Sequence, residues 1–191
     1  MDQEEYLRRK TEYLKDIQEQ FIALGNIIPQ MTLLVDRLEK QEDKPIYTSV
    51  IVPIPNAIME TDQTKQFFLT TVIPEIHEKL KSKDFIFKGV CWASEAWVRR
   101  GMKDDEEHAK VINDGTWKDL PIEKEVLITT IQTATQNECM IYEIKRGSPV
   151  VNADGNLIDS IELTLNEELS DPTGMHGGIF SNLYERFIPQ L

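Results

Sequence analysis

The chain has 191 residues, of which 40% are apolar and 28% charged, which is the composition of a folded domain rather than of a disordered chain. Its formal net charge of −12 makes direct binding to the phosphates of DNA or RNA unfavourable. The N-terminus lacks the apolar core of a secretory signal, and no stretch is long and apolar enough to cross a bilayer. We therefore expect a cytoplasmic protein with no membrane contact.

Residues 3–24 are predicted to form an amphipathic helix. Leu7, Leu14 and Phe21 recur every seven residues on one face. Gly25 follows, and glycine readily adopts the left-handed conformation that ends a helix. The apolar stripe has two interpretations: a helix packed on its own domain, or a short coiled-coil contact in a homodimer formed through residues 3–24.

Residues 27–38 and 46–54 are predicted to be strands that pair with each other across the polar turn at 39–44. Residues 62–82 follow as a helix. Pro74 lies inside this helix and removes one backbone donor, so we expect a kink or a break there.

Residues 84–93 are predicted to be a central strand. Phe85, Phe87, Cys91 and Ala93 are expected on one face, and Ile86, Val90 and Trp92 on the other. Apolar residues on both faces are typical of a strand that is covered on both sides of its sheet.

Residues 125–133 and 137–145 alternate between apolar and polar positions and are predicted to form a hairpin. A tight turn at 154–155 leads into a further strand at 157–165, and residues 179–187 are predicted to form a closing helix.

Residues 101–120 are polar and are expected to be an excursion over the surface. The order of the elements predicts an α+β fold with a mainly antiparallel sheet packed with helices. We expect a helical extension at 1–26 and a single α+β domain at 27–191.

The segment 91–97 contains the most informative carboxylate. If the strand continues through it, Glu95 shares an apolar face with Trp97 and must be paired, with Arg99 as a nearby partner. Glu95 would then be a candidate general base or cation-binding group, with Ser94, Trp97 and Arg99 as candidate binding residues. Alternatively, Ser94 caps a helix that has Glu95 in its first turn.

His176 precedes two glycines, as in the oxyanion loops of esterases, and is a second catalytic candidate. The sequence contains no Gly-x-Ser-x-Gly elbow that would supply the nucleophile. No histidine or cysteine has metal-type spacing, and no nucleotide-binding motif is present, so we predict no metal and no cofactor. Cys91 and Cys139 are expected to be buried and reduced.

The negative charge is concentrated in residues 121–191, which contain 4 lysines and arginines against 11 aspartates and glutamates. Such a surface suits a basic protein partner. It also suits a simpler role in solubility.

Four short blocks resemble a group of uncharacterised bacterial and phage or mobile-element proteins of similar size: Gly25–Pro29, Leu33–Asp36, Ala93–Trp97 and Glu125–Leu127. The resemblance implies a prokaryotic or phage origin and no known activity. It adds weight to Glu95 and its neighbours as the segment to test.

Two functions follow from these observations. The first is a non-enzymatic accessory or protein-interaction protein of a bacterium, phage or mobile element. The alternative is a small hydrolase-type enzyme that uses Glu95.

Overall fold

The computed structural model describes residues 1–38, 45–99, 122–152, 154–170 and 183–187. The expectations for the turn at 39–44, the excursion at 101–120 and His176 lie outside these residues. Six strands form one antiparallel sheet in the order β2-β1-β3-β4-β5-β6. Their bounds are Gln30–Leu38 (β1), Pro45–Pro53 (β2), Phe85–Arg99 (β3), Ile122–Thr133 (β4), Asn137–Val151 (β5) and Leu157–Leu165 (β6).

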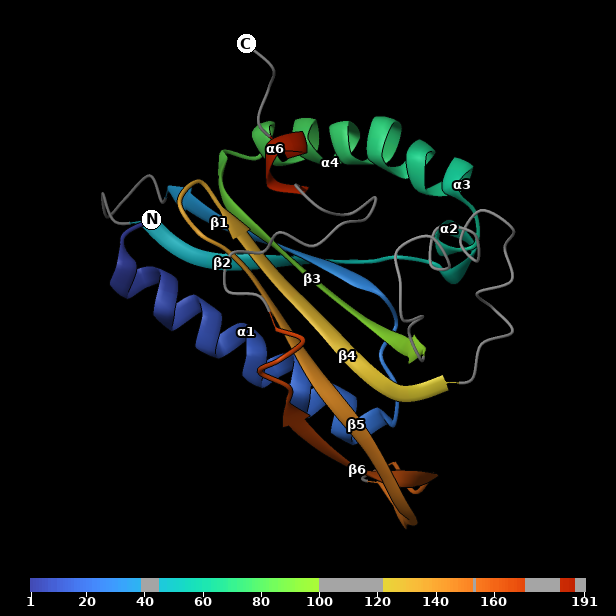
Figure 1. Cartoon of the computed structure of the whole chain (residues 1–191). Helices are drawn as coiled ribbons and strands as arrows, with labels where there is room; N and C mark the ends of the chain where they lie inside the picture. Colours follow the sequence, from blue (N-terminus) through green and yellow to red (C-terminus); the bar gives the residue numbers. More distant parts are fainter. Residues whose placement is uncertain (39–44, 100–121, 153, 171–182, 188–191) are drawn as a thin grey trace.

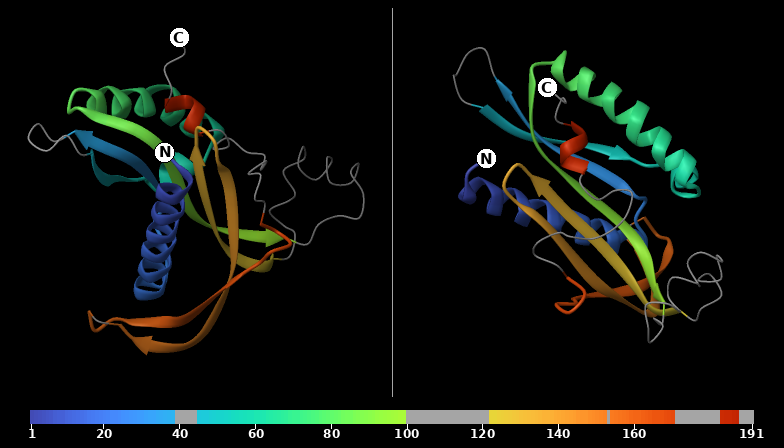
Figure 2. Two further views of the ribbon diagram at one scale, coloured as in Figure 1. Left: turned by 90° about the vertical axis from the view of Figure 1, so that its left-hand side faces the viewer. Right: turned by 45° about the horizontal axis from the view of Figure 1, so that its top comes forward.

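The sheet curls around the N-terminal helix α1 (Gln3–Leu24) (Figures 1 and 2). The other helical elements are α2 (Asn56–Met59), α3 (Asp62–Phe67), the π-helical segment η1 (Phe68–Val72), α4 (Ile73–Lys81) and α6 (Leu183–Phe187). Helix α1 lies on the concave face, whereas α3 and α4 run across the convex face. This arrangement confirms the predicted α+β class with an antiparallel sheet. No helix among the described residues is both long and apolar enough to span a membrane.

Helix α1 has the bounds that the sequence predicts. It begins where the Asp2 side chain accepts a hydrogen bond from the backbone N–H of Glu5 (2.8 Å), and it ends at Gly25, which has a φ of 78°. Its buried side is rotated by about one residue from the expected stripe, because Tyr6 and Tyr13 are buried whereas Leu7 is 50% exposed. The buried residues of the helix are Tyr6, Arg9, Tyr13, Ile17 and Phe21.

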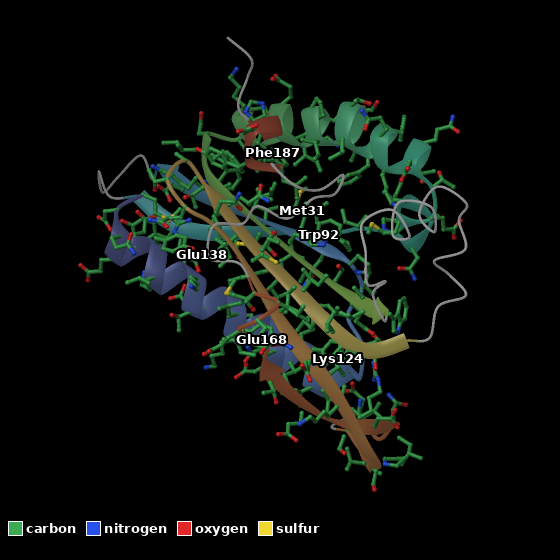
Figure 3. The ribbon with its side chains drawn as sticks, in the orientation of Figure 1. Met31, Trp92, Lys124, Glu138, Glu168 and Phe187 are labelled. Atoms are coloured by element: carbon green, nitrogen blue, oxygen red, sulfur yellow. The ribbon has the colours of Figure 1, made fainter. Side chains whose placement is uncertain are left out.

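The sheet separates two cores. On the concave face, α1 packs over residues such as Leu34, Cys91 and Leu127. On the convex face, Met31, Trp92 and Phe187 lie between the sheet and the helices (Figure 3). Strand β3 contributes to both cores and has β1 and β4 as neighbours, which confirms that it is a central strand covered on both sides.

One part of the predicted pattern in β3 is wrong. The register between β1 and β3 shifts so that Leu34 pairs with Gly89 while Val35 pairs with Phe87. The shift leaves Lys88 of β3 without a backbone pairing partner on β1, so the residues before it face the opposite side of the sheet from the predicted one. Phe85 and Phe87 therefore pack against the convex-face core, on the opposite face from Cys91.

The helical stretch predicted at 62–82 runs continuously over residues 62–81, so the break into two pieces that Pro74 was expected to cause does not occur (Figure 1). Helix α3 passes into a π-helical segment, Phe68–Val72, before α4 begins at Ile73. Pro74 lies in the first turn of α4, directly after this π-helical segment, where the helical hydrogen-bond pattern is already altered.

The remaining strands follow the sequence prediction, with one extension. Strands β4 and β5 form the expected hairpin, and β6 has the predicted bounds. Strand β5 continues to Val151, six residues beyond its expected end, so the β5–β6 hairpin projects past the core. Cys91 and Cys139 are buried and do not form a disulfide.

Candidate functional site

Glu95 lies on β3, which continues to Arg99, so the alternative in which Ser94 caps a helix is wrong. The Oε1 atom of Glu95 accepts a hydrogen bond from the backbone N–H of Ile27 (2.7 Å). Ser94 points to the other face of the strand, where its buried hydroxyl accepts a hydrogen bond from Nε1 of Trp92 (3.1 Å). Glu95 and Ser94 therefore do not share a site.

The cation that pairs with Glu95 is Arg146 on β5, whose Nη2 lies 3.3 Å from Oε2 of Glu95. The same guanidinium donates two hydrogen bonds to Glu125 on β4 (2.9 and 2.7 Å) and one to the carbonyl oxygen of Gly25 (2.7 Å). We call Gly25, Ile27, Glu95, Glu125 and Arg146 the Arg146 clasp.

The clasp unites three of the blocks that carry the sequence resemblance, since Gly25, Glu95 and Glu125 come from different blocks. Sequence reasoning expected Arg99 as the partner of Glu95 and missed Arg146. A signal was available, because Arg146 continues the alternation of Tyr142 and Ile144, which face the concave core.

The electrostatics of the clasp are those of a tight ion pair. Hydrogen bonds from Arg146 lower the pKa of Glu125, and this effect outweighs burial, which acts in the opposite direction. The hydrogen bond to Glu125 likewise raises the pKa of Arg146. Both carboxylate oxygens of Glu95 form hydrogen bonds within the clasp, so neither is available to act as a general base. Through the same bonds the clasp links the end of α1 to the sheet.

Trp97 is 57% exposed and lies directly opposite Glu125 in the β3–β4 register. It therefore borders the clasp at the open end of the concave face. The side chain of Arg99, like His176, lies outside the part of the chain whose side chains are described. Among the described residues, no group of three or more histidines, cysteines, aspartates or glutamates is arranged to hold a metal ion.

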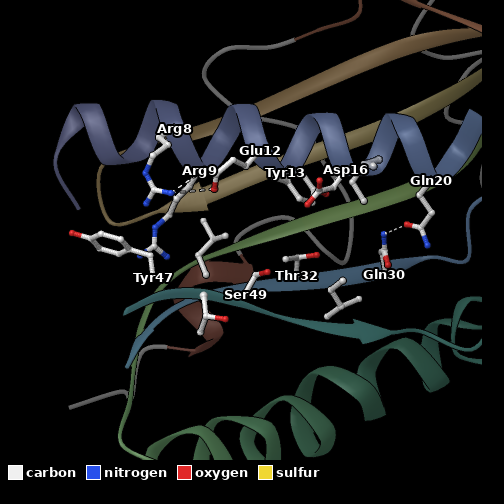
Figure 4. Close-up of a pocket in the computed structure, with 14 residues that line it drawn as sticks. Arg8, Arg9, Glu12, Tyr13, Asp16, Gln20, Gln30, Thr32, Tyr47 and Ser49 are labelled. Atoms are coloured by element: carbon white, nitrogen blue, oxygen red, sulfur yellow. Dashed lines mark hydrogen bonds and ion pairs between the residues drawn. The ribbon is translucent and has the colours of Figure 1, made fainter. Parts of the chain in front are cut away.

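A groove of about 310 Å³ lies between α1 and strands β1 and β2 (Figure 4). One wall is a row of α1 side chains four residues apart, which places them on one face of the helix. These are Arg8, Glu12, Asp16 and Gln20. The floor comes from Gln30 and Thr32 on β1 and from Tyr47, Ser49 and Ile51 on β2.

A buried ion cluster anchors the groove at the N-terminal half of α1. Arg9 is buried and pairs with Glu5 (2.7 Å) and with Asp36, and Asp36 also pairs with Lys88 (3.3 Å). Two cations and two carboxylates leave the cluster neutral. The guanidinium of Arg9 also lies 4.8 Å from the centre of the Tyr47 ring, which holds β2 against the helix.

Asp16 and Thr32 line the middle of the groove and have no ion-pair or hydrogen-bond partner among the described residues. Arg8 and Glu12 pair with each other at 3.0 Å. Asp16 is exposed and forms no ion pair within the described residues. Thr32 is only 5% exposed, yet its hydroxyl has no hydrogen-bond partner in the described part of the chain. The hydroxyl therefore opens onto the groove, although the residue as a whole is nearly buried.

The groove runs beside a strand edge that has no charged side chains. Strand β2 is at one edge of the described sheet, and its nine residues include no charged side chain. Strand β6 is at the other edge and carries Asp159 and Glu162. Helix α1 packs against β6, so the curled sheet meets the helix on that side and leaves the groove on the β2 side.

No protein-family model, curated protein or solved structure matches this chain. The functional argument therefore rests on the geometry of the clasp, the groove and the two sheet edges.

Proposed function

We propose that this protein is a non-enzymatic interaction protein, and that it binds an extended segment of a partner protein along β2. The observation that carries the proposal is the uncharged edge of β2 beside the groove. Every second residue of an edge strand directs its N–H and C=O away from the sheet, and these groups can pair with an added strand.

The contrast between the two edges supports this proposal. Proteins commonly protect edge strands with charged side chains, because an unprotected edge pairs with other chains. Asp159 and Glu162 provide such charges on β6, whereas β2 has no charged side chain among its nine residues. A strand bound along β2 would extend the sheet on its open side, next to α1.

The partner that we propose is basic. Some carboxylates of residues 121–191 are neutralised within the chain, since Glu125 pairs with Arg146, Glu138 with Lys10, and Glu143 with Lys124. Others are exposed and have no ion pair among the described residues. These are Asp154, Asp159, Glu162, Glu167, Glu168 and Glu185. They would attract a basic partner over a distance.

The proposal extends to the biological setting: an accessory protein in the cytoplasm of a bacterium, or of a phage or mobile element within it. The sequence resemblance supports this part. A homodimer through residues 3–24 stays a prediction. Because the buried side of α1 faces its own sheet, such a contact would use exposed residues such as Leu7 and Leu24.

The hydrolase alternative has less support. Glu95 uses both carboxylate oxygens inside the clasp, and the clasp contains no serine, cysteine or histidine that could act with it. A binding role requires no such group.

A selection experiment tests the proposed function. A phage-displayed library of random dodecapeptides is selected against the whole protein, and the affinity of the selected peptides is measured by fluorescence polarisation. Ile51 is 60% exposed on β2, so Ile51→Lys should leave the fold intact and weaken binding at least about tenfold, because it places a charge at the docking edge.

The matched control is Thr164→Lys, which introduces the same residue at an exposed position of the opposite edge strand, β6. We expect it to leave binding unchanged. Peptides that bind both variants as tightly as the wild type, or a selection that yields no binder, would refute the proposal.

A further inference from the structure

We infer that the segment bound along β2 carries a lysine or arginine whose side chain enters the groove and pairs with Asp16. This inference rests on the proposed function and specifies the chemistry of the partner. Its basis is the charge balance of the groove, a groove-facing hydroxyl without a partner among the described residues, and the alternation of side chains along an added strand.

One carboxylate in the groove is not paired with any cation of the described residues. Arg8 neutralises Glu12, and the buried cluster around Arg9 contains equal numbers of cations and carboxylates. Lys15 is paired with Glu19 (3.8 Å). Asp16 is therefore the groove carboxylate that the described cations do not neutralise, and a cation from a partner would complete the balance.

Thr32 supplies a second, independent observation. Figure 4 shows Asp16 on the α1 wall and Thr32 on the β1 floor of the same groove. Thr32 is only 5% exposed as a residue, and its hydroxyl, which opens onto the groove, has no partner among the described residues. An ammonium or guanidinium group in this part of the groove would donate hydrogen bonds to both the Asp16 carboxylate and the Thr32 hydroxyl.

The added strand would direct the right side chain into this space. Side chains alternate along a strand, so every second residue of the segment faces α1, as Ser49 and Ile51 do on β2. Ile51 pairs with Thr32 in the β1–β2 register and is largely exposed. It therefore offers an apolar surface for the methylene stem of a lysine or arginine whose head reaches Asp16.

A second copy of this chain fits the site less well. Its β2 strand contains no lysine or arginine and offers no cation for Asp16. Antiparallel pairing of two β2 edges would also bring a second α1 to the same side of the sheet, with a second Asp16. The occupant that we propose is therefore a basic segment of a different protein.

A double-mutant cycle tests the inference, with the selected dodecapeptides as probes. We expect these peptides to share a lysine or arginine at one position, and its replacement by methionine to reduce affinity about fivefold or more. In the Asp16→Asn variant, the same replacement should have little effect, because the charge that it pairs with is gone. Glu19→Gln, which removes an exposed carboxylate elsewhere on α1, is the matched control and should preserve the effect.

The outcomes separate the inference from the proposed function. If binding depends on Ile51 but no peptide cation couples to Asp16, the inference fails and the proposed function stands. If no binding depends on Ile51, the proposed function itself fails. If light scattering shows a dimer that Ile51→Lys dissociates, the occupant of the edge is a second copy, and the inference fails.

Discussion

The guanidinium of Arg146 forms two parallel hydrogen bonds with the carboxylate of Glu125, with Nε–Oε2 and Nη2–Oε1 distances of 2.9 and 2.7 Å. The remaining donors of this side chain reach Glu95 and the carbonyl oxygen of Gly25. One planar group thereby joins β3, β4, β5 and the end of α1, a task that suits the fixed fork of arginine.

Replacing Arg146 by methionine should lower the free energy of unfolding by about 1–3 kcal/mol, because two carboxylates and one carbonyl lose their donor. The measurement is urea denaturation followed by circular dichroism. Lys145→Met is the control, since Lys145 is exposed and forms no ion pair among the described residues. It should change stability by no more than about 0.5 kcal/mol. Equal effects of the two substitutions would contradict a stabilising role for the clasp.

The contribution of the clasp should depend on pH. Arg146 lowers the pKa of Glu125 in the folded protein, so the unfolded chain binds the proton more tightly. The stabilisation is therefore fully present above the ordinary glutamate pKa of about 4.3 and is lost as the pH falls through the lowered value. The stability difference between wild type and Arg146→Met should shrink between about pH 5 and pH 3 in urea titrations. A difference that stays constant over this range would contradict the assignment.

Helix α1 should be essential to the concave core. Phe21 is fully buried there, and Phe21→Ala should destabilise the protein by about 3–5 kcal/mol through the cavity that it leaves. Ile22→Ala, at the adjacent exposed position, should have an effect within about 0.5 kcal/mol. Removal of residues 1–26 should abolish cooperative thermal unfolding. A truncated chain that unfolds with an unchanged Tm would show that the helix is dispensable.

Gly89 lies at the register shift of β3, where a larger residue has no room. A Cβ atom at this position would lie 2.8 Å from the carbonyl oxygen of Gln132, so Gly89→Ala should cost about 1–3 kcal/mol. Gly155 has a φ of 81° but open space around it. Gly155→Asn should be nearly neutral, because asparagine tolerates this conformation. Thermal melts of both variants distinguish crowding at Gly89 from a general intolerance of glycine replacement.

Both thiols should be unreactive in the folded protein. Cys91 and Cys139 are buried and do not form a disulfide, and burial raises the pKa of Cys91 well above that of an exposed thiol. Titration with a chromogenic disulfide reagent, without reductant, should detect neither thiol in the native protein and both after unfolding in urea. Rapid reaction of one thiol in the native state, or none after unfolding, would contradict this prediction.

The elements that were predictable from the sequence are those with strong local signals. The bounds of α1 follow from its periodicity and from Gly25, and the strand at 157–165 follows from its alternation after a turn. These signals depend on residues only a few positions apart. The reversal of Phe87 in β3 was not predictable, because the register shift depends on the pairing with β1.

The candidate site divides in the same way. The importance of Glu95 could be inferred from its strand position, but its partner Arg146 lies 51 residues away in the sequence and meets it only after β3, β4 and β5 pair. The groove was not predictable either, because it forms where α1 meets β1 and β2.

The absence of charge from residues 45–53 can be read directly in the sequence, and so can the acidic residues of 157–165. Strand order and the curl of the sheet around α1 determine which of these strands lies at an edge beside a groove. Only the tertiary structure decided this, because strand order results from contacts between distant segments. The sequence determined the chemistry of each edge, and the fold determined where each edge lies.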